Sequence, residues 1–399
     1  MKANNHYLLC ASCICIVNLV YTSFLNAKTT VAERELNNAA LLYYQAFLTC
    51  PDYDDVPLYL GNRSGADIAD LRKYTSDYQH VIKLLEAADK LPYCNMAIPW
   101  LQREIGGKVD DSFFKPIRVA SMLIGANVRI LAADGDYKTA LSQCFMMRRI
   151  PWRIAENRSL LFIRPLNVTS MNRASFLNVR AVLEVMPPDE KTLRWLKEQL
   201  AEAPRMSEVH IARLEQFLEI WLRYDSPKAI SELRRKLLAN SVNETQKQKV
   251  MALTDDDLLS RIRKPFEEFH HSVIYTLSND MSYEQKHARL ESLEKEYIDQ
   301  AENNPAIILS LQLYTHEIPI SFNMTVRDTR WCNAYEVAAE IYLMKATTGR
   351  LPETIPDGVP KDPLTNKNFL YRTTDDGFIL SSPPRFKNWS EFRFKVPGG

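Results

Sequence analysis

The glycines of this chain are few, and they are confined to two parts of it. Only 11 of the 399 residues are glycine, and none lies between Gly135 and Gly349. Average usage of about 7% would give about 28. Phosphate-binding loops of the GxGxxG and GxxxxGK[ST] types need glycine for tight turns and close backbone approach, and neither pattern occurs. The glycine-free stretch therefore excludes such a loop there and indicates a long helical body.

Charge and length narrow the class of protein further. Hydrophobic residues make up 46% of the chain and charged residues 25%, with 50 basic side chains against 49 acidic ones. A chain with this balance has no general electrostatic attraction for nucleic acid, so we expect no nucleic-acid partner. Its length exceeds what one compact core usually supports, which favours two domains or an elongated helical array.

The N-terminus has the pattern of an export signal. Lys2 is followed by an apolar stretch, Leu8–Val20, and Ala27 stands at a plausible cleavage point. The stretch is shorter than the roughly 20 apolar residues of a membrane span, although extension through Phe24 would make an uncleaved anchor. We therefore predict that residues 1–27 are a signal peptide, or an N-terminal anchor if uncleaved, and that the protein is exported to the periplasm or cell envelope. Membrane contact is expected only through this segment, if it is retained.

Four cysteines remain beyond the predicted signal, namely Cys50, Cys94, Cys144 and Cys332. They are too scattered for a zinc knuckle, because no CxxC pair lies among them. Two interpretations stay open: buried free thiols in helices, or one disulfide such as Cys50–Cys94 in an oxidising compartment.

Apolar residues at helical spacing predict helices with short breaks from about residue 30 to residue 348. The predicted helices cover 32–48, 66–91 (as one helix or two), 117–133, 172–186, 189–203, 207–224, 227–239, 254–263, 265–277, 282–303 and 330–347. The most apolar of them, 117–133, contains two arginines, so we expect a buried helix and not a membrane span.

One joint between helices is well marked. Gly135 suits the C-cap of one helix, and Asp136 suits the N-cap of the next. The joint resembles one turn of a tetratricopeptide-like helical hairpin, but no repeat of about 34 residues recurs. We therefore predict an irregular, weakly tetratricopeptide-like array of helical hairpins over residues 28–325.

The last fifty residues differ in character. Residues 349–399 hold 5 of the 11 glycines and 7 of the 21 prolines. The segments 369–372, 377–381 and 391–396 have the apolar and aromatic pattern of strands. We therefore predict a C-terminal module over 326–399, one helix plus a small antiparallel sheet, in an otherwise mostly α fold.

This module contains an ordered series of short motifs. A helix is followed by Gly349-Arg350-Leu351-Pro352, then Lys361-Asp362-Pro363, then an aromatic strand ending in Tyr371, then Asp376-Gly377-Phe378-Ile379-Leu380-Ser381. From about Ala334 to Ser382 this series resembles the C-terminal region of the major pseudopilins of type II secretion and similar tails of exported bacterial proteins. The resemblance implies the local fold and an extracytoplasmic location.

The chain departs from pseudopilins at two places. Its N-terminus lacks their short leader and long hydrophobic assembly helix with a glutamate near the processed end. The stretch 382–388 is basic, where pseudopilins of this kind have calcium-binding acids. The resemblance therefore implies neither pilus assembly nor a calcium site, and we expect no cofactor.

Two Glu-x-x-His pairs are candidate metal ligands: Glu267 with His270, and Glu284 with His287. Each pair shares one face of its helix, and paired motifs of this type build di-iron sites in four-helix bundles. Their distances from the predicted hairpin turn offset them by roughly 7 Å along the bundle. A solvated polar face is therefore the simpler interpretation of all four residues.

No nucleophile motif such as GxSxG occurs, so catalytic candidates are scattered. His316 and Glu317 would make an acid–base pair in a cleft, and a hydrolase site would combine them with Glu267 and His270. An extended helical body offers surface more than a reactive centre. The leading prediction is thus a non-catalytic scaffold or binding protein for a protein or cell-envelope component. The alternatives are a hydrolase and a pseudopilin-related component of a secretion apparatus.

Overall fold

The computed structural model describes most of the chain between Asn37 and Pro397. Outside the described residues lie 1–36, 58–66, 97–113, 156–164, 204, 206–210, 212–213, 216–229, 232–233, 236–237, 239–243, 304–317, 385–388, 390 and 398–399. The predicted signal peptide therefore lies outside them, as do the candidate pair His316 and Glu317 and most of the predicted helices 207–224 and 227–239.

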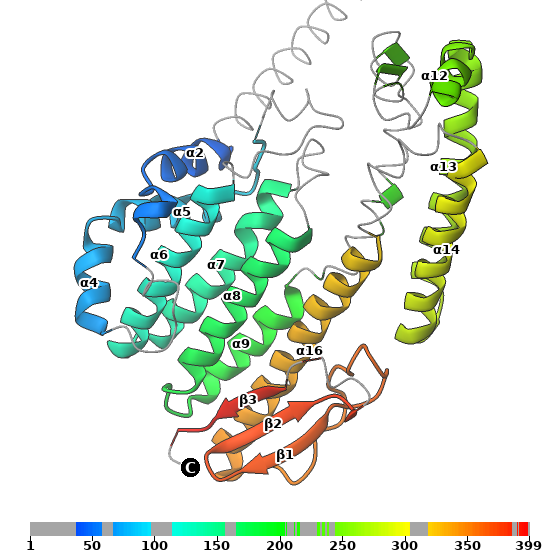
Figure 1. Ribbon diagram of the computed structural model, residues 1–399. Coiled ribbons are helices and arrows are strands. Elements are labelled where there is room, and N and C mark those ends of the chain that lie inside the picture. Colours follow the sequence, from blue (N-terminus) through cyan, green and yellow to red (C-terminus); the bar gives the residue numbers. More distant parts are fainter. Residues whose placement is uncertain are drawn as a thin grey trace, which may run out of the picture.

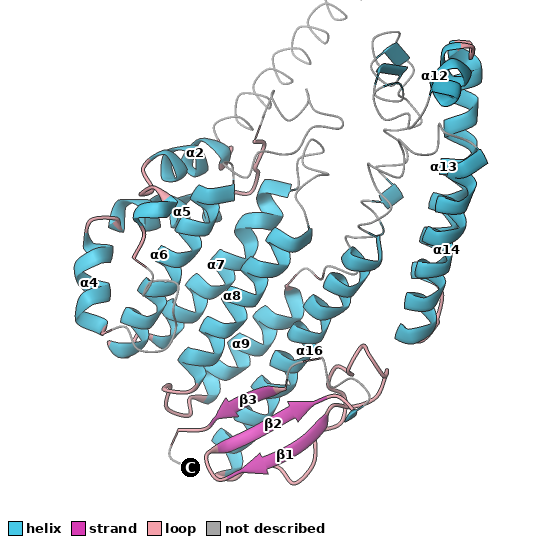
Figure 2. Cartoon of the chain, in the orientation of Figure 1, coloured by secondary structure: helices cyan, strands magenta, loops and turns pink. Residues whose placement is uncertain are grey.

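The fold is mostly helical with one small sheet near the C-terminus, as the sequence predicts (Figures 1 and 2). The described helices are α2 (Ala40–Leu48), the 3-10 turn η1 (Tyr53–Asp55), α4 (Ile68–Ser76), α5 (Gln79–Lys90), α6 (Phe114–Ala133), α7 (Tyr137–Ala155), α8 (Pro165–Leu183), α9 (Glu190–Glu202), α12 (Glu244–Met251), α13 (Asp255–Ser278), α14 (Tyr283–Asn303) and α16 (Ile318–Thr348). The strands are β1 (Leu370–Thr374), β2 (Gly377–Ser381) and β3 (Phe392–Lys395).

The helices pack as successive neighbours around two hydrophobic clusters. In the larger cluster, α6, α7 and α8 pack against one another, and α16 packs on α8 and α9 (Figure 1). This cluster extends from Ala39 to Val396, so the sheet and the helical body share one core. A smaller cluster joins α13, α14 and the first turns of α16. The predicted boundary between residues 325 and 326 falls inside α16.

Helix α6 lies at the centre of the larger cluster. Among the described residues, its segment Lys115–Ala133 is long and apolar enough to cross a membrane. Yet 67% of that window is buried inside the protein, where α6 packs against α4, α7 and α8. These contacts agree with the buried helix predicted from the sequence.

The predicted joint between α6 and α7 is confirmed in detail. Gly135 adopts the left-handed conformation, with φ of 80°, that a helix C-cap requires. The Asp136 carboxylate accepts a hydrogen bond from the Thr139 N–H at 3.3 Å, as an N-cap does.

Several helix boundaries predicted from the sequence are wrong; α8, for example, begins at Pro165 and not at residue 172. The predicted helices 254–263 and 265–277 are one helix, α13, with Pro265 in its interior. Proline removes one backbone hydrogen bond and usually breaks a helix. Here apolar residues on both sides of Pro265, Leu258 and Phe266, are buried, so packing of the continuous helix offsets that cost. Helix α16 begins at Ile318, twelve residues before the predicted start at 330.

A row of polar side chains follows α16 at intervals of four residues, on one ridge of the helix. Each member pairs with a side chain from the neighbouring helices or the segment after α9: Asp328 with Asn172 (2.8 Å), Cys332 with Arg148 (3.0 Å), Glu336 with Arg205 (2.5 Å) and Glu340 with Lys197 (2.6 Å). Burial raises the pKa of Glu336, and the Arg205 guanidinium opposes the shift.

The C-terminal sheet has the order β1-β2-β3, with both pairs antiparallel. The predicted strands are confirmed to within two residues at each end. Gly377 is required at the start of β2, because a Cβ there would collide with the Phe394 carbonyl oxygen and approach Lys395 Cα to 2.9 Å. The sheet packs on α16 through edge-to-face aromatic contacts such as Tyr342 with Phe378.

Asp362 fixes the loop between α16 and β1 and is fully buried. Its carboxylate accepts hydrogen bonds from the Leu364 N–H (3.1 Å) and the Ser382 hydroxyl (2.5 Å). The carboxylate lies 3.7 Å from Nε of Arg330, whose guanidinium covers the Phe392 ring at 4.6 Å. Burial lowers the pKa of Arg330 to about 10, and Asp362 opposes that shift. One aspartate thus joins the loop, the sheet and α16.

All four described cysteines are free, and the Cys50–Cys94 disulfide is not formed. Cys144 and Cys332 lie in helices, whereas Cys50 and Cys94 follow helices α2 and α5. Burial raises the pKa of the Cys50 and Cys332 thiols to about 12. The structure therefore agrees with the free-thiol interpretation.

Candidate functional site

The first Glu-x-x-His pair lies in the smaller hydrophobic cluster, not on a solvated face. His270 is fully buried, and its Nε2 lies 2.6 Å from the Leu214 carbonyl oxygen, an N–H···O hydrogen bond in the tautomer that protonates Nε2. Burial lowers the pKa of His270 to about 4, so the imidazole is neutral near pH 7. The prediction of a solvated face is wrong for this residue, because His270 occupies the apolar stripe of α13 while Glu267 lies at its edge.

The second pair lies on α14 and contacts different residues. Glu284 is exposed, as predicted. His287 Nδ1 lies 3.4 Å from the Glu291 carboxylate, and its Nε2 lies 3.1 Å from the amide nitrogen of Asn323. The Asn323 oxygen accepts a 2.8 Å hydrogen bond from the Tyr283 hydroxyl. This polar chain ties α14 to α16.

The two pairs do not combine into one site. His270 bonds Leu214, and His287 bonds a residue of α16. In the part of the chain that the structure describes, no group of three or more His, Cys, Asp or Glu side chains is placed to hold a metal ion. The proposed hydrolase site also needs His316 and Glu317, which lie outside the described residues, so that alternative stays a prediction.

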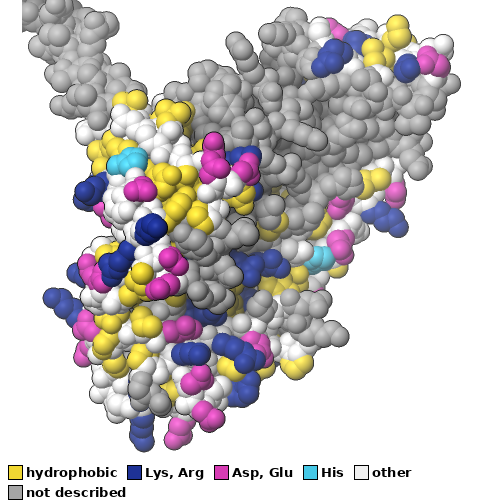
Figure 3. All heavy atoms as spheres, turned by 60° about the vertical axis from the view of Figure 1, so that its left-hand side comes forward, with side chains coloured by type: hydrophobic (Ala, Val, Ile, Leu, Met, Phe, Trp, Pro, Cys, Tyr) yellow, Lys and Arg dark blue, Asp and Glu magenta, His cyan; other side chains and the backbone are white. Residues whose placement is uncertain are grey.

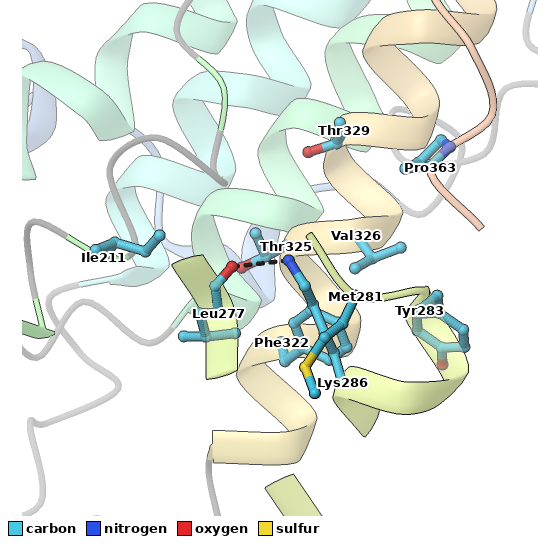
Figure 4. Close-up of a pocket in the computed structure, with 10 residues that line it drawn as sticks. All are labelled: Ile211, Leu277, Met281, Tyr283, Lys286, Phe322, Thr325, Val326, Thr329 and Pro363. Carbon is cyan, nitrogen blue, oxygen red and sulfur yellow. Dashed lines mark hydrogen bonds between the residues drawn. The ribbon is translucent and has the colours of Figure 1, made fainter. Parts of the chain in front are cut away.

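The structure instead contains a cavity where the turn between α13 and α14 meets α16 (Figure 4). Its volume is about 190 Å³. Helices α13, α14 and α16, the turn at 279–282 and the 363 loop all contribute side chains to its wall. The lining residues are Ile211, Leu277, Met281, Tyr283, Lys286, Phe322, Thr325, Val326, Thr329 and Pro363.

Local sequence fixes the turn that forms one side of this cavity. The Ser282 hydroxyl accepts from the Gln285 N–H at 3.2 Å, and the Gln285 side-chain oxygen accepts from the Ser282 N–H at 2.9 Å. This reciprocal pair is a capping box, which satisfies two backbone donors at the start of α14. The Asn279 N–H donates to the Tyr275 carbonyl and ends α13. Met281 and Tyr283 are thereby held at the cavity wall (Figure 4).

Lys286 is the one charged residue among the ten that line the cavity. Its Nζ donates a 2.8 Å hydrogen bond to the Leu277 carbonyl oxygen (Figure 4). Burial lowers the pKa of Lys286, and Asp280 opposes that shift. Within the described residues, no carboxylate lies within ion-pair distance of this ammonium. The cavity therefore combines mainly apolar walls with a single, half-buried cation.

No signal in the sequence marks this site, because its residues come from segments far apart in the chain. The spacing of Phe322, Thr325, Val326 and Thr329 does mark one face of a helix, but the helix predicted there begins only at residue 330. Elsewhere, acidic and basic side chains are interspersed on the face shown in Figure 3, in keeping with the balanced composition.

Comparisons of this chain with protein-family models, with curated proteins and with solved structures found no match. The cavity and its neighbours are therefore interpreted from their own geometry and chemistry.

Proposed function

We propose that the protein is an exported, non-catalytic binding protein whose ligand site is the cavity between α13, α14 and α16. The export pattern of residues 1–27 supports the location, and the resemblance of residues 334–382 to exported bacterial proteins is consistent with it. The ligand is a small, mainly apolar molecule of the kind that an envelope compartment contains.

The observation on which this proposal depends is the lining of the cavity. Leu277, Met281, Phe322 and Val326 supply apolar surface, and the polar atoms there are few. Ligand sites are typically concave and mostly apolar, with a small number of placed polar groups. The scaffold around the cavity is also fixed, since the capping box holds the turn and the Tyr283–Asn323 hydrogen bond joins α14 to α16.

The test uses a neutral aromatic probe and a substitution at the cavity wall. Benzyl alcohol is titrated into the full chain and binding is followed by calorimetry and by the rise in melting temperature. Met281→Trp is the blocking variant, because Met281 is 37% exposed and a larger ring there fills the cavity without disturbing a fully buried position. Tyr275→Trp, on the 69% exposed Tyr275 of the same hairpin, is the matched control.

We expect saturable binding to the parent chain and to the control, and at least a tenfold loss of affinity in Met281→Trp. A bound ligand stabilises the folded state by RT ln(1 + [L]/Kd), so the melting temperature should rise with probe concentration in the first two proteins only. Equal binding by both tryptophan variants, or no saturable binding at all, would refute the proposed site.

A further inference from the structure

We infer that the ligand of this cavity is a monocarboxylate with an apolar body of about six to eight carbons, held by Lys286. This inference rests on the proposed function and specifies the chemical class of the ligand. Its basis is the juxtaposition of an apolar cavity of limited size with one ammonium that has no counter-ion among the described residues.

The size of the apolar body follows from the volume. An apolar cavity of about 150 Å³ accommodates benzene. The present cavity is about 190 Å³, and it is lined by Leu277, Phe322 and Val326 at its apolar side. It therefore has room for one aromatic ring or a short alkyl chain with a small polar group.

The charge of the ligand follows from Lys286. An ammonium has three N–H donors, and the Leu277 carbonyl oxygen accepts from one of them. A carboxylate would accept from the others in charge-assisted hydrogen bonds, which are about twice as strong as neutral ones. It would also stabilise the charged form of Lys286, which burial disfavours, as the lowered pKa of this lysine indicates.

The surrounding acids do not already serve as partners of this ammonium. Asp280 is exposed and lies beyond ion-pair distance, so its attraction is weak in solvent. Glu284 is also exposed and does not line the cavity. A ligand carboxylate at the cavity wall would thus be the closest anion to Lys286, whereas a cationic ligand would meet repulsion.

The test compares benzoate, benzyl alcohol and benzylamine, which share one ring and differ in charge. For the parent chain we expect benzoate to bind at least tenfold more tightly than benzyl alcohol, a difference of about 1.4 kcal/mol. Benzylamine should bind more weakly than the alcohol. The preference for benzoate should shrink as salt rises, because salt screens the pair at a half-exposed site.

The variants separate charge from packing. Lys286→Gln removes the charge and keeps a donor for the Leu277 carbonyl, so it should erase the preference for benzoate while benzyl alcohol still binds. Lys286→Met should likewise erase the preference for benzoate while benzyl alcohol still binds. Agreement between the two variants would show that the loss comes from the missing charge and not from the glutamine amide. Lys295→Met, at an exposed lysine of the same helix, should keep the preference of the parent chain.

The outcomes distinguish the two proposals. If benzyl alcohol binds as tightly as benzoate to the parent chain, or if Lys286→Gln keeps the preference, the inference of a carboxylate ligand is wrong and the cavity remains a neutral binding site. If none of the three probes binds, the proposed function fails together with this inference.

Discussion

The buried pair Arg330–Asp362 allows a quantitative prediction about how the C-terminal sheet is held. The side chain of Arg330 is 2% exposed and that of Asp362 is not exposed at all. Replacing Asp362 by Asn keeps oxygen and nitrogen atoms near Leu364 and Ser382 but removes the anion that faces the Arg330 charge. Breaking a buried pair by removing one charge costs about 3–5 kcal/mol. Asn keeps one acceptor oxygen, for the Leu364 N–H, but its amide nitrogen cannot accept from the Ser382 hydroxyl. We therefore expect Asp362→Asn to lose about 3 kcal/mol or more, within that range.

The assay is equilibrium urea unfolding, followed by far-ultraviolet circular dichroism, of four proteins that form a double-mutant cycle. These are the parent chain, Asp362→Asn, Arg330→Met and the double variant. Residues in direct contact show interaction energies of about 0.5–3 kcal/mol in such cycles. The double variant removes both charges of the pair, so it should be clearly more stable than the sum of the two single losses predicts.

A surface pair provides the control. Glu190 and Arg194 approach to 2.7 Å, but both side chains are more than half exposed. Exposed pairs of this kind contribute about 0–1 kcal/mol, so Glu190→Gln should leave the unfolding midpoint almost unchanged. A loss below about 1 kcal/mol in Asp362→Asn, or strictly additive losses across the cycle, would refute the reasoning.

Two further predictions concern stability. Gly377→Ala should destabilise the chain by about 2 kcal/mol or more, because the added Cβ meets the backbone of β3. Gly358→Ala, at φ of 77° with open space around it, should cost only about 1 kcal/mol; equal losses in urea unfolding would contradict the close approach at Gly377. His270 has a folded-state pKa of about 4, below its ordinary value of 6.5, so the unfolded state binds the proton more readily between these values. Its contribution to stability is therefore complete above pH 6.5 and is lost as the pH falls toward 4, by at most about 3 kcal/mol. His270→Gln should flatten this part of the profile of stability against pH, and an unchanged slope would show that another group is responsible.

The sequence is sufficient to predict the fold class and the sheet. The absence of glycine from 136 to 348 indicates helices because helices do not need positive φ angles, and the strand predicted at 377–381 has the same bounds as β2. The caps at Gly135 and Asp136 are also predictable, since both act through backbone groups within a few residues. Such features are determined locally, and local chemistry is what a single sequence displays.

Features that depend on tertiary contacts are not predictable in this way. Pro265 is an expected helix breaker, and only the burial of its neighbours shows why α13 continues through it. The prediction for His270 is wrong for a similar reason, because its hydrogen-bond partner, the Leu214 carbonyl, lies 56 residues away. The cavity combines segments near 280, 325 and 363, and no periodicity in any one segment could reveal it.

The polar row on α16 sets a limit on how this chain can change in length. Its members, from Asp328 to Glu340, face their partners only while the helix keeps its rotational phase. One inserted residue turns everything beyond it by about 100° and shifts it by about 1.5 Å along the axis. An insertion after Cys332 would thus direct Glu336 away from Arg205 and Glu340 away from Lys197. It would also displace the sheet from the face of α16 on which it packs. Homologous chains should therefore differ in α16 by substitution and place their insertions and deletions in the loops on either side.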